Sequence, residues 1–110
     1  MHGRELPAIT HLQFLVLGVL LAGEESGRAI REVIASYGLR RSGPAFYQMM
    51  ARMERDGIVQ GSYEQIIVGD QAVTERRYRI TPAGAQQWKK ACAFYETAKI
   101  AAAREGWSNA

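Results

Sequence analysis

The sequence is poor in the residues that most catalytic and metal sites require. It holds one cysteine, Cys92, and two histidines, His2 and His11. A single cysteine excludes an intramolecular disulfide and a cysteine-based zinc site, and it fits a reducing cytoplasm. Two histidines near the N-terminus leave no Ser/His/Asp constellation and no metal cluster. We therefore expect a cytoplasmic protein that is not an enzyme and that has no metal or cofactor.

Long hydrophobic runs are also missing. The longest, residues 14–22, is nine residues long and contains Gly18, whereas a membrane-spanning helix needs about 20. This run therefore predicts a buried helix. No internal repeat, low-complexity tract or Pro/Ser-rich linker divides the 110 residues, so we expect a single compact unit with one core.

The charge is unevenly placed. The chain has 14 Lys+Arg against 11 Asp+Glu, a net charge of +3, and 11 of the 14 basic residues are arginine. Residues 28–56 alone contain six arginines and three acidic residues, a surplus equal to that of the whole chain. Because a guanidinium fork binds two acceptors at once, this segment favours contacts with phosphates and bases. Its expected partner is double-stranded DNA.

Hydrophobic periodicity predicts three helices in the first half. The first covers about residues 8–22 and ends at Gly23; the second follows Ser26 and ends at Gly38; the third follows Ser42, with Pro44 in its first turn, and ends at Asp56-Gly57. The core face of the second helix consists of Ala29, Ile30, Val33 and Ile34, and that of the third of Phe46, Met49, Met50 and Met53.

The pattern then changes from period 3.6 to period 2. Residues 58–68 and 73–80 are β-rich runs on either side of residues 69–72, which predicts a hairpin. Thr81-Pro82 begins a long last helix that continues to about residue 104. The fold class is therefore mainly α with a β-hairpin wing (α+β): a winged helix-turn-helix DNA-binding domain at residues 1–81, followed by a dimerisation helix and tail at residues 82–110.

The last helix carries an apolar stripe at three- and four-residue spacing, made of Trp88, Ala91, Tyr95, Ala98 and Ala102. The core of the domain is expected to be nearly complete without this helix. The stripe therefore predicts packing against a partner subunit in a homodimer, whose symmetry implies a pseudo-palindromic operator.

Three segments resemble the PadR-like family of transcriptional regulators, in its short-tailed branch. Residues 42–59 resemble the recognition helix, residues 76–84 the wing strand and the Thr-x-x-Gly start of the final helix, and residues 15–20 the first helix. The resemblance covers about residues 8–100. The chain departs from the family at residues 26–30, where the usual His-Gly-Tyr-Glu-Ile is replaced, at Met50 and Met53 in place of leucine, and at Pro44.

The resemblance implies a homodimeric repressor, which in some members is released by planar aromatic compounds bound between subunits. The residues at matching positions are Phe14, Trp88, Cys92 and Tyr95. The alternative is that these aromatic side chains only pack in the core or in the dimer interface. A redox role for Cys92 has little support, since no second cysteine accompanies it.

A recognition helix lies in the major groove with its N-terminal residues at base edges. Gln48 can pair with adenine, Arg52 with guanine, and Ala45 can contact a thymine methyl, with Pro44 also at the base edges. The expected phosphate contacts are Arg40, Arg41, Ser42 and Tyr47, and in the wing Arg77 and Arg79 contact phosphate or the minor groove.

Two alternatives remain open. The polar face of the third helix can be an ordinary solvated surface, and Glu64 and Glu75 can pair with the wing arginines across the hairpin. Alternatively, the whole chain can be a winged-helix protein–protein interaction module without specific DNA binding, its basic face bound to an acidic partner.

Overall fold

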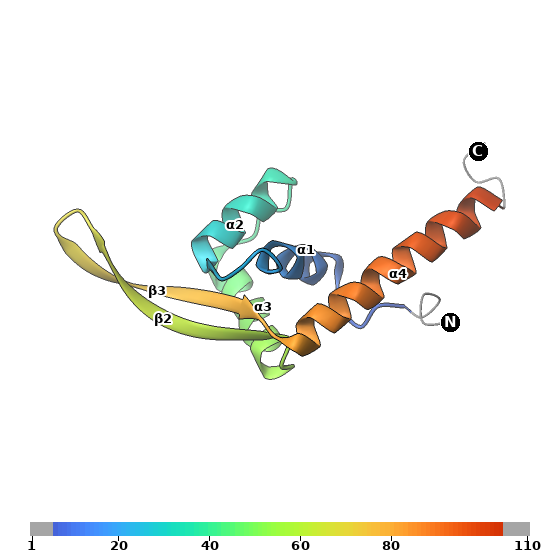
Figure 1. The fold of residues 1–110 in the computed structure, drawn as a ribbon. Coiled ribbons are helices and arrows are strands. Elements are labelled where there is room, and N and C mark those ends of the chain that lie inside the picture. Colours follow the sequence, from blue (N-terminus) through green and yellow to red (C-terminus); the bar gives the residue numbers. More distant parts are fainter. Residues whose placement is uncertain (1–5, 105–110) are drawn as a thin grey trace.

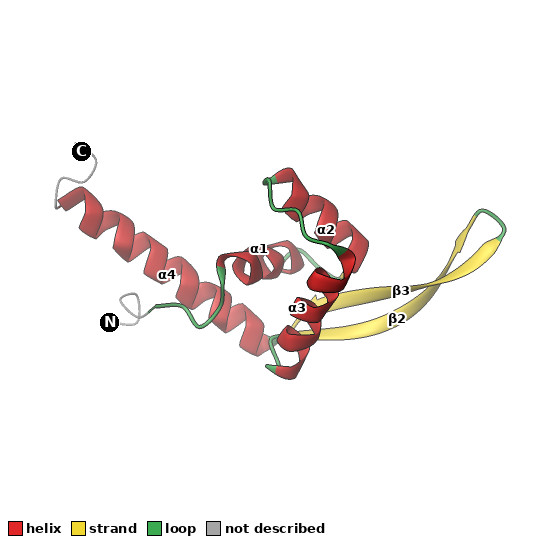
Figure 2. Ribbon diagram, turned by 180° about the vertical axis from the view of Figure 1, so that it is seen from behind, coloured by secondary structure: helices red, strands yellow, loops and turns green. Residues whose placement is uncertain are grey.

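A computed structural model describes residues 6–104, so His2 and the expected tail at residues 105–110 lie outside the described part of the chain. Three short helices form a body from which a long hairpin and a long helix extend on opposite sides (Figures 1 and 2). The expected order of helices and hairpin is confirmed. The elements are α1 (His11–Leu20), β1 (Glu25–Ser26), α2 (Gly27–Ser36), α3 (Gly43–Arg55), β2 (Val59–Val68), β3 (Gln71–Ile80) and α4 (Pro82–Arg104).

The wing hairpin is longer and more tightly turned than predicted. β2 and β3 pair antiparallel from Val59↔Ile80 to Val68↔Gln71, so only Gly69 and Asp70 form the turn and the predicted four-residue turn is wrong. Gly69 has φ 64° while Asp70 has no positive φ, and a positive φ at the first of two turn residues is what a type II′ turn requires. This geometry lets pairing continue through Gln71 and Ala72.

A third strand joins the sheet, and sequence analysis missed it. The two-residue β1 pairs with β3, with Glu25 opposite Tyr78 and Ser26 opposite Arg77, which gives the order β1-β3-β2. Two residues are too few for a period-2 pattern to be recognised. Ser26 also caps α2, as predicted, because its hydroxyl accepts a hydrogen bond from the amide of Ala29 at 3.0 Å. This strand therefore ties the start of α2 to the base of the wing.

The core lies between α1, α2, α3 and the base of the hairpin. The predicted stripe of α3 is confirmed, since Phe46, Met49, Met50 and Met53 are all buried. They pack with Val16, Leu17 and Leu20 of α1 and with Ile30 and Ile34 of α2. Val33 was expected on the same face of α2, but 38% of it is exposed.

The bounds predicted for the first helix are wrong by about one turn at its start. The hydroxyl of Thr10 accepts a hydrogen bond from the amide of Gln13, and the Gln13 side chain accepts one from the amide of Thr10. This capping box fixes Thr10 as the N-cap and leaves Ala8 and Ile9 outside the helix. At the other end α1 stops at Leu20, and Gly23 has a φ of 144°.

The stripe of α4 packs partly within its own subunit, which corrects the expectation that it faces a partner. Ala91 is completely buried, and Trp88 and Tyr95 pack against the core beside Phe14 of α1. Beyond Tyr95 the helix extends away from the body (Figure 1) and Ala98 is exposed. Within the described residues, the second half of the stripe makes no such contact with the core, whereas the half-buried Trp88 and Tyr95 of the first half pack within the subunit.

Tyr78 is the largest side chain in the core that is less than 2% exposed. It lies on β3 with its neighbour Arg77 on the opposite face of the strand, as the period-2 pattern predicts. Burial raises the pKa of Tyr78 to about 12, because the interior disfavours the phenolate.

Candidate nucleic-acid interface

The N-terminus of α3 is fixed by its cap and by a contact from α2. The hydroxyl of Ser42 accepts a hydrogen bond from the amide of Ala45 at 3.2 Å, and proline occupies the first turn as predicted. The guanidinium of Arg31 in α2 donates to the carbonyl oxygen of Arg41 at 3.3 Å. The two helices of the helix-turn-helix are therefore joined next to the start of the expected recognition helix.

The outer face of α3 presents the two side chains predicted to contact bases. Gln48 and Arg52 are exposed one helical turn apart, while Phe46, Met49 and Met53 face the core. No hydrogen bond or ion pair with another residue of the range 6–104 engages either side chain. Both are therefore available to a partner molecule, and Ala45, half-buried, lies one turn nearer the N-terminus.

Tyr47 joins α3 to α2. Its ring lies 2.7 Å from the position that a Cβ atom would occupy at Gly27, and it packs edge-on against Phe46 at 5.0 Å between ring centroids. About a third of Tyr47 remains exposed. A side chain at residue 27 would displace this ring, so the glycine allows the close approach of the two helices. The predicted phosphate contact of Tyr47 stays a prediction.

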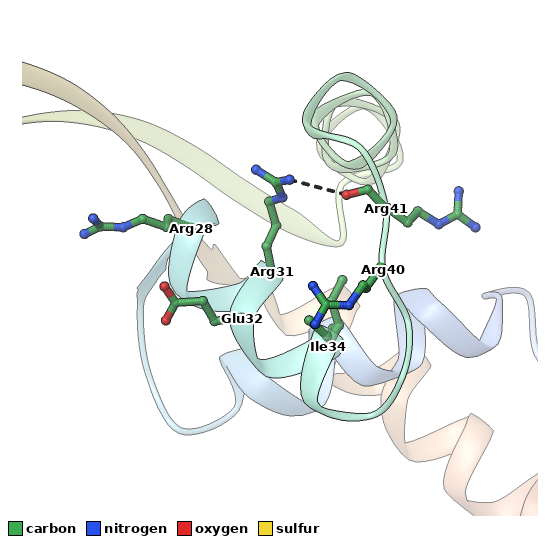
Figure 3. Close-up of a pocket in the computed structure, with 7 residues that line it drawn as sticks. Arg28, Arg31, Glu32, Ile34, Arg40 and Arg41 are labelled. Atoms are coloured by element: carbon green, nitrogen blue, oxygen red, sulfur yellow. Dashed lines mark hydrogen bonds between the residues drawn. The ribbon is translucent and has the colours of Figure 1, made fainter.

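A basic depression lies between α2 and the turn that leads to α3 (Figure 3). We call it the arginine pocket. Its volume is about 230 Å³, and it is lined by Arg28, Arg31, Glu32, Ile34, Ala35, Arg40 and Arg41. Arg28 and Arg31 belong to the charge surplus of residues 28–56, but the sequence alone did not place them in a site. Their three-residue spacing on one helix was the signal that they share a face.

Within the arginine pocket the side chains differ in direction. In Figure 3 Arg31 is directed toward the carbonyl of Arg41, and the side chains of Arg28 and Arg41 point outward on opposite sides. Arg28 also lies 3.4 Å from Glu75 of the wing, a long ion pair in which Arg28 is exposed and Glu75 is mostly buried. Arg31 and Arg40 therefore lie nearest to the pocket itself.

The arginines at the base of the wing are held by protein groups. Arg76 forms an ion pair with Glu54 of α3 at 2.6 Å, and its guanidinium lies 4.3 Å from the centroid of the Tyr63 ring. Burial opposes the charge of Arg76, but the hydrogen bond and the charge of Glu54 outweigh burial and raise its pKa. This ion pair attaches the hairpin to the end of α3.

Arg77 lies among three carboxylates. It is 2.9 Å from Glu24, 3.1 Å from Glu64 and 3.3 Å from Glu75. The hydrogen bond to Glu24 is the main cause of the raised pKa of Arg77. For Arg77 the structure thus contains the pairing across the hairpin that the sequence left open. Arg79 instead donates two hydrogen bonds to the Gln60 side chain, at 3.0 and 2.8 Å.

The residues considered for an aromatic effector form a cluster between α1 and α4. Phe14 stacks on Trp88 at 5.8 Å and meets Tyr95 edge-on at 5.5 Å. Tyr95 also forms a hydrogen bond with Nδ1 of His11 at 2.8 Å, a contact that sequence analysis missed. Cys92 is partly buried, and burial raises the pKa of its thiol.

Within residues 6–104 no group of three or more His, Cys, Asp or Glu side chains could hold a metal ion. Among the helices of the same range, none is both long and apolar enough to cross a membrane.

Comparison with known proteins identifies the fold. No protein-family model and no curated protein matches the chain. Among solved structures, a PadR family transcription regulator from hypervirulent Clostridium difficile is similar with a TM-score of 0.73 and 14% identity, over 86% of this chain and 97% of that chain. A transcriptional regulator from Clostridium thermocellum is similar with a TM-score of 0.69 and 23% identity, over 86% and 88% of the two chains.

A third solved structure contains DNA. It is Bacillus subtilis PadR in complex with operator DNA, with a TM-score of 0.58 and 20% identity, over 73% of this chain and 45% of that chain. The chain is therefore a winged helix-turn-helix protein with a long C-terminal helix. More particularly, it has the fold of PadR-family transcriptional regulators.

Proposed function

We propose that this protein is a cytoplasmic PadR-like transcriptional regulator that binds a pseudo-palindromic DNA operator as a homodimer and represses transcription. The observation that carries the proposal is the outer face of α3 at Gln48 and Arg52. Gln48 and Arg52 are exposed and unengaged within the described residues, and the opposite face of the helix completes the core. A rigid helix with free hydrogen-bonding side chains suits base readout in a major groove.

The roles of individual residues follow from their positions. Gln48 and Arg52 read bases, with Pro44 and Ala45 close to them, while Arg40, Arg41, Ser42 and Tyr47 contact phosphates. In the wing, exposed Arg79 is the stronger candidate for a DNA contact. The contribution of Arg77 is expected to be smaller, because Glu24, Glu64 and Glu75 already offset its charge.

Two substitutions separate base readout from phosphate binding. Arg52→Ala is expected to reduce the preference for operator over random DNA by about 5- to 150-fold, since a good bidentate pair contributes ~1–3 kcal/mol of discrimination. Arg41→Ala is expected to weaken binding to both DNAs equally and to lower the salt slope by about one per subunit, or about two for the dimer. Fluorescence anisotropy with a labelled duplex from the upstream region of the gene, in excess unlabelled random DNA, measures both. Identical behaviour of the two variants would contradict this orientation of α3.

The dimer is proposed to form through α4. Its last turns leave the body, and a groove of about 310 Å³ between α1, α2 and α4 offers apolar side chains to a second copy. The groove is lined by Phe14, Leu15, Gly18, Val19, Val33, Ile34, Tyr37 and Trp88. Val33 and Tyr37 are exposed at this groove, and a second copy of the chain bound there would bury them.

A charge at the exposed part of the α4 stripe tests this interface. Ala98→Glu is expected to shift the protein from the mass of a dimer to that of a monomer in sedimentation equilibrium, because burying an unpaired carboxylate is costly. Lys99→Glu, at the exposed neighbouring position, serves as the control and is expected to remain dimeric. A wild-type protein that sediments as a monomer at every concentration would contradict the proposed dimer.

We also propose that a planar aromatic compound releases the operator by binding at Phe14, Trp88, Cys92 and Tyr95. The support is that three aromatic side chains of this set lie in contact between α1 and α4. A compound there would bias the dimer geometry toward a state with lower DNA affinity. Aromatic acids that release operator equally from the wild type and from Trp88→Leu would contradict this site.

A further inference from the structure

The arginine pocket concentrates positive charge that the protein neutralises only in part. Its lining contains four arginines, of which Arg28 pairs with Glu75 at 3.4 Å, and one acidic residue, Glu32. Within residues 6–104 no carboxylate lies within 4.0 Å of Arg31 or Arg40, whereas Arg76 and Arg77 are both ion-paired. Uncompensated like charges in a concave site raise the local concentration of anions.

The floor of the arginine pocket strengthens this effect. Ile34 is 1% exposed and Ala35 is half-buried, so the lower wall is apolar. Concave sites with an apolar wall focus the field of the charges that line them. An anion is therefore attracted more strongly there than on a flat surface with the same charges.

One of the guanidinium groups is already oriented. Arg31 donates to the carbonyl oxygen of Arg41, which fixes the end of its side chain between the two helices. An arginine that forms one hydrogen bond with the backbone still has further donors free. A ligand bound there would touch the residues that set the start of α3.

The wing provides a contrast. Between Tyr63 and Thr74 the sequence contains Glu64 and Asp70 and no lysine or arginine. The outer part of the wing therefore offers phosphate no cationic side chain, whereas α2, α3 and the turn between them offer Arg31, Arg40, Arg41, Arg52 and Arg55.

We propose that the arginine pocket binds a phosphoryl group, held chiefly by Arg31 and Arg40. Ligand pockets for whole small molecules usually measure about 300–1,000 Å³, so the 230 Å³ of this pocket suits a small anionic group. The group comes either from the DNA backbone or from a free phosphorylated compound that competes with DNA. Binding of a DNA phosphate rests on the proposed function, whereas binding of a free phosphorylated compound does not.

Binding of a free phosphorylated compound is tested with inorganic pyrophosphate alone. Amide NMR signals of residues 28–41 are expected to shift saturably in the wild type, at an ionic strength kept constant with chloride. Arg40→Gln is expected to weaken this binding at least about tenfold, the loss typical of a charged hydrogen bond. Arg104→Gln, an exposed arginine at the far end of α4, is the matched control and should bind as the wild type does.

Binding of a DNA backbone phosphate is tested with random duplex DNA and the same three proteins. Arg40→Gln is expected to lower the slope of log K against log salt by about one per subunit, or about two for the dimer, and Arg104→Gln to leave it unchanged. An effect of Arg40→Gln in the DNA measurement alone assigns the phosphoryl group to the DNA backbone. An effect with pyrophosphate alone assigns the group to a free phosphorylated compound, and an effect in both measurements means that such a compound competes with DNA for the pocket.

The proposal is overturned if Arg40→Gln matches Arg104→Gln in both measurements. Failure of the proposed function would look different. The wild type would then bind no DNA at low salt, while the pyrophosphate titration would still decide the pocket.

Discussion

Raising the salt concentration from about 50 to about 200 mM is expected to weaken DNA binding by about 10³–10⁵-fold, for a dimer that contacts 6–10 phosphates. The physical reason is the release of counterions from each phosphate that an arginine neutralises. Each subunit supplies Arg31, Arg40, Arg41, Arg52 and Arg55 from α2, α3 and their connecting turn. None of these five forms an ion pair within residues 6–104, so their charges remain available.

Anisotropy titrations at several salt concentrations measure the slope on operator and on random DNA. The same slope separates the proposed regulator from the alternative of a protein–protein interaction module. An acidic protein partner releases far fewer counterions, so its binding would fall less steeply and would show no preference among DNA sequences. A flat dependence on salt, or no DNA binding at low salt, would favour the interaction module.

Gly84→Ala is expected to destabilise the protein by about 1–3 kcal/mol, the usual cost of adding a methyl group to a fully packed site. Gly84 is buried in the first turn of α4, and an added Cβ atom would collide with the carbonyl oxygen of Ile58 and with the side chain of Ile80. The Ile58 atom in this collision is a backbone oxygen at the start of the hairpin. It cannot move aside as the end of a flexible side chain could. At an ordinary helical position the same change is stabilising by about 0.5–1 kcal/mol.

Gly43→Ala is the matched control, because it adds the same methyl group in the first turn of α3. Its Cβ atom would lie 3.6 Å from Nη1 of Arg31, an ordinary contact. No neighbouring element would be displaced, so this variant is expected to lose less stability than Gly84→Ala, its one cost being that a Cβ atom directly before Pro44 disfavours the helical conformation. Thermal unfolding followed by circular dichroism compares the two, and a loss of 1 kcal/mol lowers Tm by about 4–8 °C in a domain of this size. Equal Tm values would show that α4 can shift away from the hairpin without cost.

The order of the elements was readable because local signals agree with one another. Ser42 with Pro44 begins α3, and four buried side chains at helical spacing run along it, so cap, turn and periodicity all indicate the same helix. The hairpin was recognised for the same reason. Where only one signal was used, as at residues 8–22, the bounds were wrong, since Thr10 and Gln13 form a capping box that the apolar pattern does not reveal.

The prediction that the apolar stripe of α4 packs against a partner subunit was wrong for the first half of the stripe. Periodicity identifies an apolar stripe but not the surface against which it packs. Trp88, Ala91 and Tyr95 are apolar at helical spacing whether they pack on α1 or on another subunit. The choice depends on where Thr81 places the helix. Its hydroxyl donates to the carbonyl of Gly57 and accepts from the amide of Gly84, which directs α4 back along α1.

The sequence by itself determined the order of the four helices and the hairpin, the α3 core stripe and the candidate base-reading residues, because each depends on spacing within a single helix or hairpin. Tertiary structure alone decided which arginines are free. Arg76 and Arg77 look like Arg40 and Arg41 in the sequence, yet the fold brings Glu54, Glu24, Glu64 and Glu75 to the first pair and no carboxylate of the described residues to the second. Several of these carboxylates are far from their arginines in the chain. Charge compensation acts through space, and spacing along the sequence does not encode it.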